Sequence, residues 1–193
     1  VVPLTSAITV LRHGEEERCA VHYADGRMET APLAALGQFV SEEGNPGNRK
    51  GVRAVFVEIA HDFLKNGLRL VDTPGVGSVF ELNSETTRAF LPRIDIALVV
   101  LGCDPPVTSE ELHLIRAMAP LTEYILVVLN KADLVSPEGQ AKADAFTRTV
   151  LRDVLGGAPG PLAACSALQA LDGPGDGGVP PLASRLSALA ASG

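Results

Sequence analysis

Several features that would assign a chain to a class at once are missing from this sequence. It contains no uninterrupted apolar run of roughly 18 residues, the length that a membrane-spanning helix needs. Its amino-terminal residues show no charged flank followed by an apolar run, so no signal peptide is predicted. Acidic residues outnumber basic ones, and the net charge of −7 argues against a general attraction to nucleic acid or to anionic lipid.

Cysteine is scarce as well. Cys19, Cys103 and Cys165 lie far apart, with no CxxC pair and no spacing typical of metal ligands. Isolated cysteines fit a reducing compartment, so we expect a cytoplasmic protein. What the sequence does have is apolar content: 46% of its 193 residues are hydrophobic and 20% are charged. This composition predicts one globular domain over residues 1–193 rather than a disordered tail.

The first third of the chain has the pattern of a small sheet. Residues 7–12 and 19–23 are predicted strands, and Asp25-Gly26 is a hairpin-turn signal that leads to a third strand near Met28. Residues 42–51 are rich in glycine and asparagine and are predicted to form a loop. Residues 53–60 alternate between apolar and other side chains, which predicts a strand with one buried face.

The rest of the chain alternates strands and helices. Apolar runs at 68–71, 94–101 and 124–129 predict strands that are buried on both faces, as in a parallel sheet covered by helices. A capping box at Thr108–Glu111 and a cap at Ser136 predict two helices, the second ending at Gly156. A last strand at 159–164, a flexible loop at 173–178 and a closing helix at 181–191 complete an α/β fold with a mostly parallel sheet.

The first candidate site motif is Asp72-Thr73-Pro74-Gly75, which follows an apolar strand. Ligands bind at the carboxyl ends of the strands in open parallel sheets. A carboxylate there suits hydrated Mg²⁺, and a glycine lets a backbone N–H approach a phosphate closely. The alternative is an ordinary strand-end turn with an Asx hydrogen bond.

The most specific motif is Asn130-Lys131-Ala132-Asp133, after the next apolar run. The Asp133 carboxylate can accept two hydrogen bonds from the N1–H and the exocyclic amine of guanine, which adenine does not offer. Asn130 would connect this loop to neighbouring loops and to the edge of the base, and the Lys131 stem can cover the face of the base. The alternative is a polar strand-end loop. Ser166-Ala167, after the last predicted strand, is a weaker third motif whose backbone N–H can meet the guanine carbonyl.

These motifs, in this order, resemble those of GTPases of the translation-factor class, which implies a P-loop-NTPase-type three-layer fold. The resemblance narrows to bacterial dynamin-like GTPases. In that family a Pro-x-Thr-[Ser/Ala] segment opens a strand that ends in Arg-x-Gly, and here these are Pro3-Leu4-Thr5-Ser6 and Arg12-His13-Gly14. The long interval between Thr5 and Asp72 is similar to that of dynamins, in which extra strands are inserted.

The resemblance implies a role for each matching residue. Thr5 and Asp72 would hold Mg²⁺, Thr5 and Gly75 would act in catalysis, and the nucleotide would be bound by Asp72, Thr73, Pro74, Gly75, Asn130, Lys131, Asp133, Ser166 and Ala167. The reaction would convert GTP and water to GDP and phosphate by positioning and charge stabilisation. Val76 stands where many small GTPases have a water-orienting glutamine.

The family also implies partners. Hydrolysis would be helped by self-association through the nucleotide face, and membrane remodelling would involve regions outside this chain. We expect a cytoplasmic protein that is peripheral at a membrane and does not bind nucleic acid.

One family motif is missing, because no Gly-x-x-x-x-Gly-Lys-[Ser/Thr] phosphate-binding loop occurs in the sequence. In the family this loop precedes the switch threonine, so the chain is interpreted as a GTPase domain that is truncated at its amino terminus. It would then bind nucleotide very weakly by itself. Two other functions stay open: a pseudo-GTPase that serves as an interaction module, and a GTPase associated with the ribosome or translation.

Overall fold

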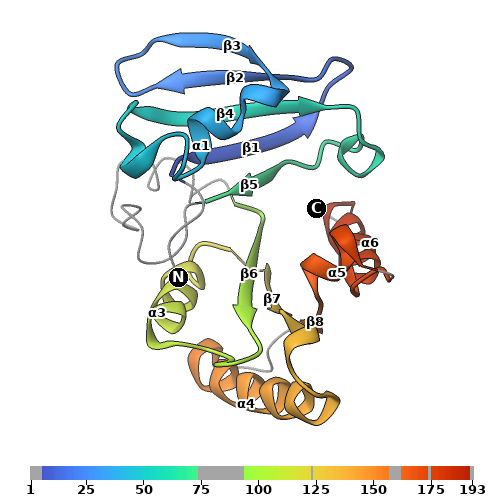
Figure 1. The fold of residues 1–193 in the computed structure, drawn as a ribbon. Helices are drawn as coiled ribbons and strands as arrows, with labels where there is room; N and C mark the ends of the chain where they lie inside the picture. The colour runs from blue at the N-terminus through green and yellow to red at the C-terminus, as the bar shows by residue number, and fades with distance from the viewer. Residues whose placement is uncertain (1–5, 74–93, 123, 157–161, 174, 192–193) are drawn as a thin grey trace. The chain divides into compact units, whose positions relative to one another are not determined.

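The structure is a computed structural model, and it describes residues 6–73, 94–122, 124–156, 162–173 and 175–191. The chain divides into two compact units, residues 1–87 with 187–193 and residues 88–186, and each is described by itself. Figure 1 shows the elements of both units along the chain. A single domain over residues 1–193 stays a prediction.

The first unit is built on a five-stranded sheet with the strand order β3-β2-β4-β1-β5. Its strands are β1 (Ile8–His13), β2 (Arg18–Tyr23), β3 (Met28–Pro32), β4 (Val52–Ile59) and β5 (Leu70–Asp72). Strands β1 and β4 are parallel, whereas the other three pairs are antiparallel. Short helical turns join the strands: η1 (Leu33–Ala35), α1 (Gly37–Val40), η2 (Pro46–Asn48) and η3 (Asp62–Leu64).

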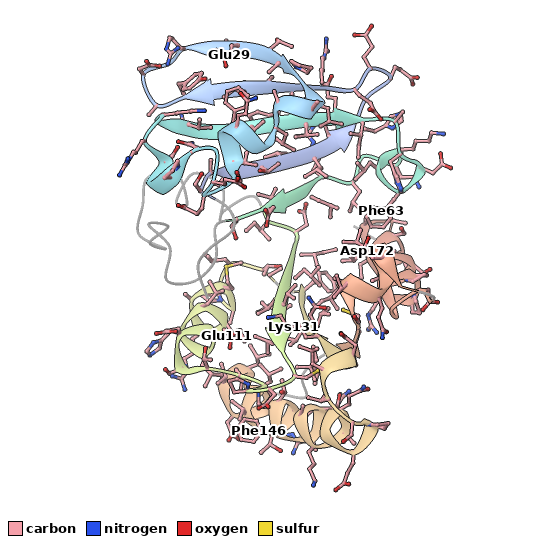
Figure 2. The ribbon with its side chains drawn as sticks, viewed as in Figure 1. Glu29, Phe63, Glu111, Lys131, Phe146 and Asp172 are labelled. Atoms are coloured by element: carbon pink, nitrogen blue, oxygen red, sulfur yellow. The ribbon has the colours of Figure 1, made fainter. Side chains whose placement is uncertain are left out.

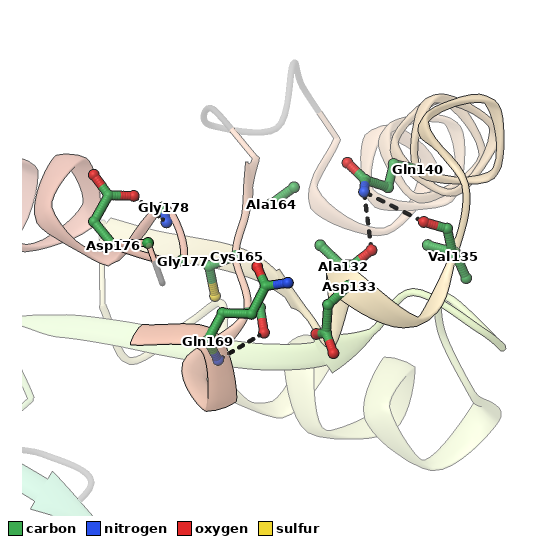
Figure 3. A pocket seen from close by; sticks show the side chains of 12 residues that line it. Ala132, Asp133, Val135, Gln140, Ala164, Cys165, Gln169, Asp176, Gly177 and Gly178 are labelled. Atoms are coloured by element: carbon green, nitrogen blue, oxygen red, sulfur yellow. Dashed lines mark hydrogen bonds between the residues drawn. The ribbon is translucent and has the colours of Figure 1, made fainter. Parts of the chain in front are cut away.

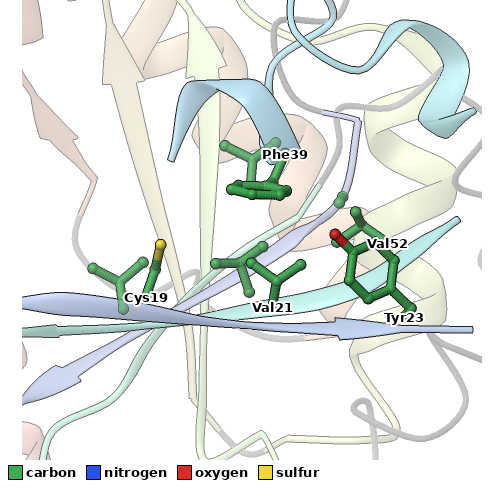
Figure 4. Packing of buried hydrophobic residues seen from close by; sticks show 9 residues of the cluster. Cys19, Val21, Tyr23, Phe39 and Val52 are labelled. Carbon is green, nitrogen blue, oxygen red and sulfur yellow. The ribbon is translucent and has the colours of Figure 1, made fainter. Parts of the chain in front are cut away.

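The predicted hairpin between β2 and β3 is confirmed. Gly26 has a φ of 87°, a conformation that costs glycine little, and the Tyr23 N–H donates to the Arg27 carbonyl over 2.9 Å. The core of this unit lies on the face of the sheet covered by α1. Figure 4 shows Phe39 of α1 lying over Val21 of β2, and both side chains are buried. Burial of a phenylalanine of this kind stabilises the fold by about 2 kcal/mol.

The Arg-x-Gly sequence at the end of β1 has a structural explanation. The partly buried Glu58 carboxylate on β4 accepts hydrogen bonds from the Arg18 Nε over 2.7 Å and from the Arg12 guanidinium. These two arginines, Arg18 first, hold the pKa of the Glu58 carboxyl below its ordinary value. A methyl group at Gly14 would lie 2.7 Å from the Glu58 Cβ, so only glycine leaves room for this ion pair.

The second unit contains a three-stranded parallel sheet with the order β6-β7-β8. Its strands are β6 (Ile96–Gly102), β7 (Tyr124–Asn130) and the short β8 (Ala163–Ala164). The helical segments of the remaining chain are α3 (Ser109–Met118), η5 (Ala132–Leu134), α4 (Pro137–Leu155), α5 (Ala167–Asp172) and α6 (Val179–Ala190). Side chains of α3 and α4, including Ile115 and Leu151, form one buried cluster with Val99, Leu101 and Leu129 of the strands.

The two predicted helix starts are confirmed. The Thr108 hydroxyl accepts from the Glu111 N–H, and the Glu111 carboxylate accepts from the Thr108 N–H over 2.7 Å, which completes a capping box. The Ser136 hydroxyl accepts from the Gly139 N–H over 3.2 Å at the start of α4. That helix ends at Gly156, which has a φ of 68°. No helix in the described part of the chain is long and apolar enough to cross a membrane.

The α/β class is confirmed, and the sheets differ in character. The sheet of the second unit is parallel throughout, as expected, whereas the five-stranded sheet is mixed. The prediction that the runs at 68–71 and 94–101 are buried on both faces is wrong. Val71 of β5 is 41% exposed, and Val100 of β6 is 52% exposed. Both strands are at the edges of their described sheets, and β6 packs against helices on one face, whereas the central strand β7 is buried as predicted.

Candidate functional site

The carboxyl ends of β7 and β8 bring the second and third sequence motifs together. Parallel pairing places Leu129 beside Ala164, so the residues after both strands meet at one edge of the sheet. Two further backbone bonds extend this contact past the strands. The Cys165 N–H donates to the Leu129 carbonyl over 2.9 Å, and the Ala132 N–H donates to the Cys165 carbonyl over 3.0 Å. The two loops therefore form one connected backbone unit.

Asn130 is the main link between these loops. Its Oδ1 accepts from the Lys131 N–H over 2.8 Å and from the Ala167 N–H over 3.0 Å, and the Cys165 thiol lies 3.8 Å from the same oxygen. Because two backbone donors point at one atom, that atom must be the oxygen of the amide. The Nδ2 group is accordingly turned away, and no described residue accepts a hydrogen bond from it.

Asp133 is carried by a turn that is held from several sides. Lys131 begins the turn with a φ of 62°, a left-handed conformation that costs a side-chain-bearing residue about 1 kcal/mol. From α4, the Gln140 Nε2 donates to the Ala132 carbonyl over 2.9 Å, and the Ala132 side chain is buried. Lys131 and Asp133 themselves are exposed, and Figure 2 labels Lys131 in this turn. The backbone that carries Asp133 is therefore held in place, and its carboxylate is accessible.

An open depression of about 510 Å³ lies against this turn (Figure 3). Its lining includes Asp133, Gln140, Ser166, Gln169, Asp176 and Gly177. Figure 3 shows Gln140 from α4 on one side of it and the Asp176–Gly178 segment on another. Polar side chains and backbone from four separate segments thus border the same space.

Ser166 and Ala167 lie where β8 leads into α5. The Ser166 side chain is buried, and its hydroxyl accepts from the Gln169 N–H over 3.2 Å as the cap of α5. The Ser166 N–H donates to the Gly177 carbonyl over 2.8 Å. Both backbone N–H groups of the third motif consequently have acceptors within the chain, Gly177 for Ser166 and Asn130 for Ala167.

The buried thiols beside this site are in their protonated form at neutral pH. Burial raises the pKa of Cys165, with a further rise from the nearby Cys103 thiol. Burial raises the pKa of Cys103 too, and the Asp133 charge adds to it. Neither cysteine is disulfide-bonded, and in this state they behave as small packing residues.

The first motif lies in the other unit, at the end of β5. Asp72 pairs with Thr9 of β1 and is exposed. Neighbouring atoms still remove part of the water around its carboxyl, and this desolvation raises the pKa of the group. Within the described residues, no hydrogen bond or ion pair engages this carboxylate. Thr73 follows it and is exposed, whereas Thr5, Pro74 and Gly75 lie outside the described residues.

Asp72 fits the chemistry of a magnesium site. An accessible carboxylate oxygen without a cationic neighbour in the described part of the chain is a suitable partner for a hard cation. The buried Thr9 hydroxyl on the opposite strand has no hydrogen-bond partner there. A complete cluster of three or more His, Cys, Asp or Glu side chains is not found among the described residues. Asp72 by itself offers carboxylate oxygens at the end of β5.

Three contributors to the site were not predicted from the sequence. Gln140 was not singled out because the helix that contains it was predicted from its caps and its apolar positions, and neither marks a polar residue of the first turns. Helix α5 has six residues, too few for an apolar period to stand out. The Gly177 carbonyl lies in a segment that was predicted to be a flexible loop, and no local signal reveals a tertiary acceptor.

The fold and the strand-end residues together define a GTPase-like α/β protein, and comparison with known proteins identifies its family. The profile of the Dynamin family matches residues 1–132. The chain belongs to the dynamin family, and the resemblance to bacterial dynamin-like proteins is confirmed.

Related proteins come from bacteria and plants. An uncharacterised protein in the xynA 3′ region of Caldicellulosiruptor sp. strain Rt8B.4 is 34% identical over 154 residues, covering 80% of this chain and 38% of that protein. A probable transmembrane GTPase, FZO-like and chloroplastic, from Arabidopsis thaliana is 27% identical over 139 residues, covering 69% of this chain and 12% of that protein.

Among solved structures, a chain of an oligomerised bacterial dynamin pair has a TM-score of 0.70 at 19% identity. That alignment covers 98% of this chain and 31% of the solved one. At this identity the likeness shows the fold alone. This chain spans well under half the length of all three proteins.

Proposed function

We propose that this chain is the guanine-reading part of a GTP-binding and GTP-hydrolysing domain in a dynamin-like protein. The observation that carries the proposal is the Asn130 link. Asn130 uses its Oδ1 to hold two backbone N–H groups, and its Nδ2 donor has no acceptor among the described residues. The exposed Asp133 carboxylate follows three residues later, on the turn that begins at Lys131. A polar pair of this kind suits a base that presents both an acceptor and two adjacent donors.

Each residue would then have a distinct task. Asp133 accepts hydrogen bonds from the N1–H and exocyclic amine of guanine, Asn130 donates from Nδ2 to the edge of the base, and the Lys131 stem covers its face. Adenine leaves the Asp133 carboxylate unpaired, and sites built on hydrogen bonds reject such an analogue by roughly 10⁴-fold. The base is thereby selected by the chain's own polar groups.

The residues proposed to contact the phosphates of the nucleotide are taken from the family resemblance. Asp72 and Thr5 would hold Mg²⁺, with Thr73, Pro74 and Gly75 beside the phosphates. Magnesium held by these residues would neutralise charge on the transferred phosphoryl group. Thr5 would orient the attacking water and the Gly75 N–H would donate to the terminal phosphate.

Self-association through the nucleotide face and action at a membrane complete the proposal. One solved relative is described as an oligomerised bacterial dynamin pair that provides a mechanism for the long-range sensing and tethering of membranes. We propose that this protein is cytoplasmic, as its isolated cysteines indicate, and that it associates peripherally with a membrane through regions outside the chain.

The test is nucleotide titration by calorimetry on the protein expressed from its complete reading frame. GDP should bind far more tightly than ADP, and Asp133→Asn should weaken GDP by about 100-fold while improving the binding of xanthosine diphosphate. Asp153→Asn is the matched control, since Asp153 is an exposed carboxylate on α4 away from the depression, and it should behave like the wild type. Equal affinity for GDP and ADP would contradict the proposal and favour a nucleotide-independent interaction module.

A further inference from the structure

The chain after α5 returns to the beginning of its own helix. The Gly177 carbonyl accepts from the Ser166 N–H over 2.8 Å. One residue on, the Gly178 N–H donates to the Asp176 carboxylate over 2.9 Å, which holds the turn in shape. In Figure 3, Asp176, Gly177 and Gly178 lie beside Cys165, on the border of the depression that Asp133 also lines. The returning segment is therefore part of the candidate site.

Both glycines are required by the backbone of this contact. Gly177 has a φ of 57° and Gly178 a φ of 74°, in the left-handed region that side-chain-bearing residues rarely adopt. A methyl group on Gly177 would collide with the Ser166 carbonyl oxygen, and one on Gly178 would lie 2.9 Å from the Ala164 carbonyl oxygen. The atoms in the way are backbone, so no side chain can turn aside to make room.

This contact determines which N–H of the third motif is able to read a base. The Ser166 N–H is committed to a backbone acceptor that the double glycine fixes. The Ala167 N–H is held by the Asn130 Oδ1, which also receives the Lys131 N–H and so keeps a donor if Ala167 is released. Ala167 is thus the donor that can change partner at low cost.

We propose that the Gly177–Gly178 pair is a positioning element that aims the Ala167 N–H at the 6-carbonyl of a bound guanine or hypoxanthine ring. The inference rests on the proposed function, because it assumes a nucleotide at this edge of the sheet. On binding, the ring carbonyl takes the Ala167 hydrogen bond from Asn130, while the Ser166–Gly177 bond stays intact. Displacement of the glycine pair moves Ser166, and with it the next amide along the chain.

The experiment uses Gly177→Ala in the protein from its complete reading frame, titrated with GDP, IDP and ADP. GDP and IDP both have the 6-carbonyl, so each should lose about tenfold in affinity with their ratio unchanged, whereas ADP binding should stay as in the wild type. Gly156→Ala is the matched control. Gly156 is also left-handed, with a φ of 68°, but nothing lies within 4 Å of an added methyl group and the residue ends α4 away from the depression. It should lower the melting temperature and leave all three affinities unchanged.

The outcomes distinguish a glycine pair that positions the Ala167 N–H from one that only stabilises the fold. Equal losses for GDP, IDP and ADP, or no loss at all, would overturn the proposal, because a structural role weakens every ligand alike or none. If Gly177→Ala does not fold, Asp176→Ala loosens the same turn without a collision and should give the same pattern at about threefold. NMR spectra of the wild type should show the Ala167 amide shifting on GDP addition while that of Ser166 stays in place. Failure of the proposed function would be visible separately, as a wild type that binds ADP as well as GDP.

Discussion

Replacement of Asn130 separates the structural task of its oxygen from the binding task of its nitrogen. Asn130→Ala removes the acceptor of the Lys131 and Ala167 N–H groups. A typical hydrogen bond contributes about 1 kcal/mol, so two lost bonds should lower the free energy of unfolding by about 2 kcal/mol. For a chain of this size, that corresponds to a fall of about 6 °C in melting temperature. The left-handed Lys131 also loses the bond that supports it.

Asn130→Asp keeps an oxygen that can accept from both N–H groups, and it replaces the Nδ2 donor by a charged oxygen. Its charged oxygen accepts the same two N–H groups at least as strongly, so its melting temperature should stay close to that of the wild type. GDP affinity should nevertheless fall by at least tenfold, because the donor to the base is gone and a second negative charge stands near Asp133. Titration at high salt, which screens that charge, measures the part of the loss that comes from the missing donor.

The two variants are measured by differential scanning calorimetry and by GDP titration on the protein from its complete reading frame. Loss of stability only in Asn130→Ala, with loss of affinity in both variants, is the expected result. The reasoning is refuted if Asn130→Ala melts at the wild-type temperature, since the two bonds would then contribute nothing. It is refuted equally if Asn130→Asp binds GDP as tightly as the wild type at high salt.

Substitutions at four further positions test other parts of the structure. Thr147→Val should raise the free energy of unfolding in urea by about 1 kcal/mol, because the fully buried Thr147 hydroxyl has no partner among the described residues. Thr108→Ala should lower it by about 1 kcal/mol through loss of the cap of α3, and Thr108→Ser should retain it. Lys131→Gly should be more stable than Lys131→Ala by up to about 1 kcal/mol, since glycine adopts the left-handed turn freely. The pKa of Glu58 is lowered in the folded state, chiefly by Arg18, so its stabilisation is present above the ordinary glutamate pKa of about 4.3 and lost as pH falls through the lower folded value. Glu58→Gln should therefore lower the urea midpoint at pH 7 and converge with the wild type in acid.

Features that depend on neighbouring residues in the chain were predicted well. The Asp25-Gly26 hairpin, the Thr108 capping box and the end of α4 at Gly156 all follow from chemistry within four residues of each position. The motif after β7 was found in the same way, because a buried apolar run that ends in polar residues marks the carboxyl edge of a strand. Local sequence therefore located the candidate base-reading side chains, and their roles stay a proposal.

Features that depend on distant partners could not be predicted. The apolar run at 68–71 gives no sign that β5 pairs antiparallel with β1, because strand direction is set by the neighbour and not by composition. The exposure of Val100 on β6 also depends on distant residues. Its apolar side chain suggests a core position, yet α3 and α4 pack against the opposite face of the strand, which carries Val99 and Leu101. Burial of a strand is decided by what covers it.

The glycines after α5 show that a glycine-rich sequence can form either a mobile loop or a tight backbone contact. Glycine-rich sequence predicts freedom, and freedom is what Gly177 and Gly178 need in order to reach a conformation that other residues avoid. Once there, they pack directly on the backbone of Ala164 and Ser166, and the absence of side chains produces a tight contact instead of a mobile loop. The two glycines thus hold the Ser166 N–H, the backbone donor just before Ala167, in one position. Gly177→Ala adds a single methyl group, yet it is expected to lower GDP affinity because that group collides with the Ser166 carbonyl oxygen.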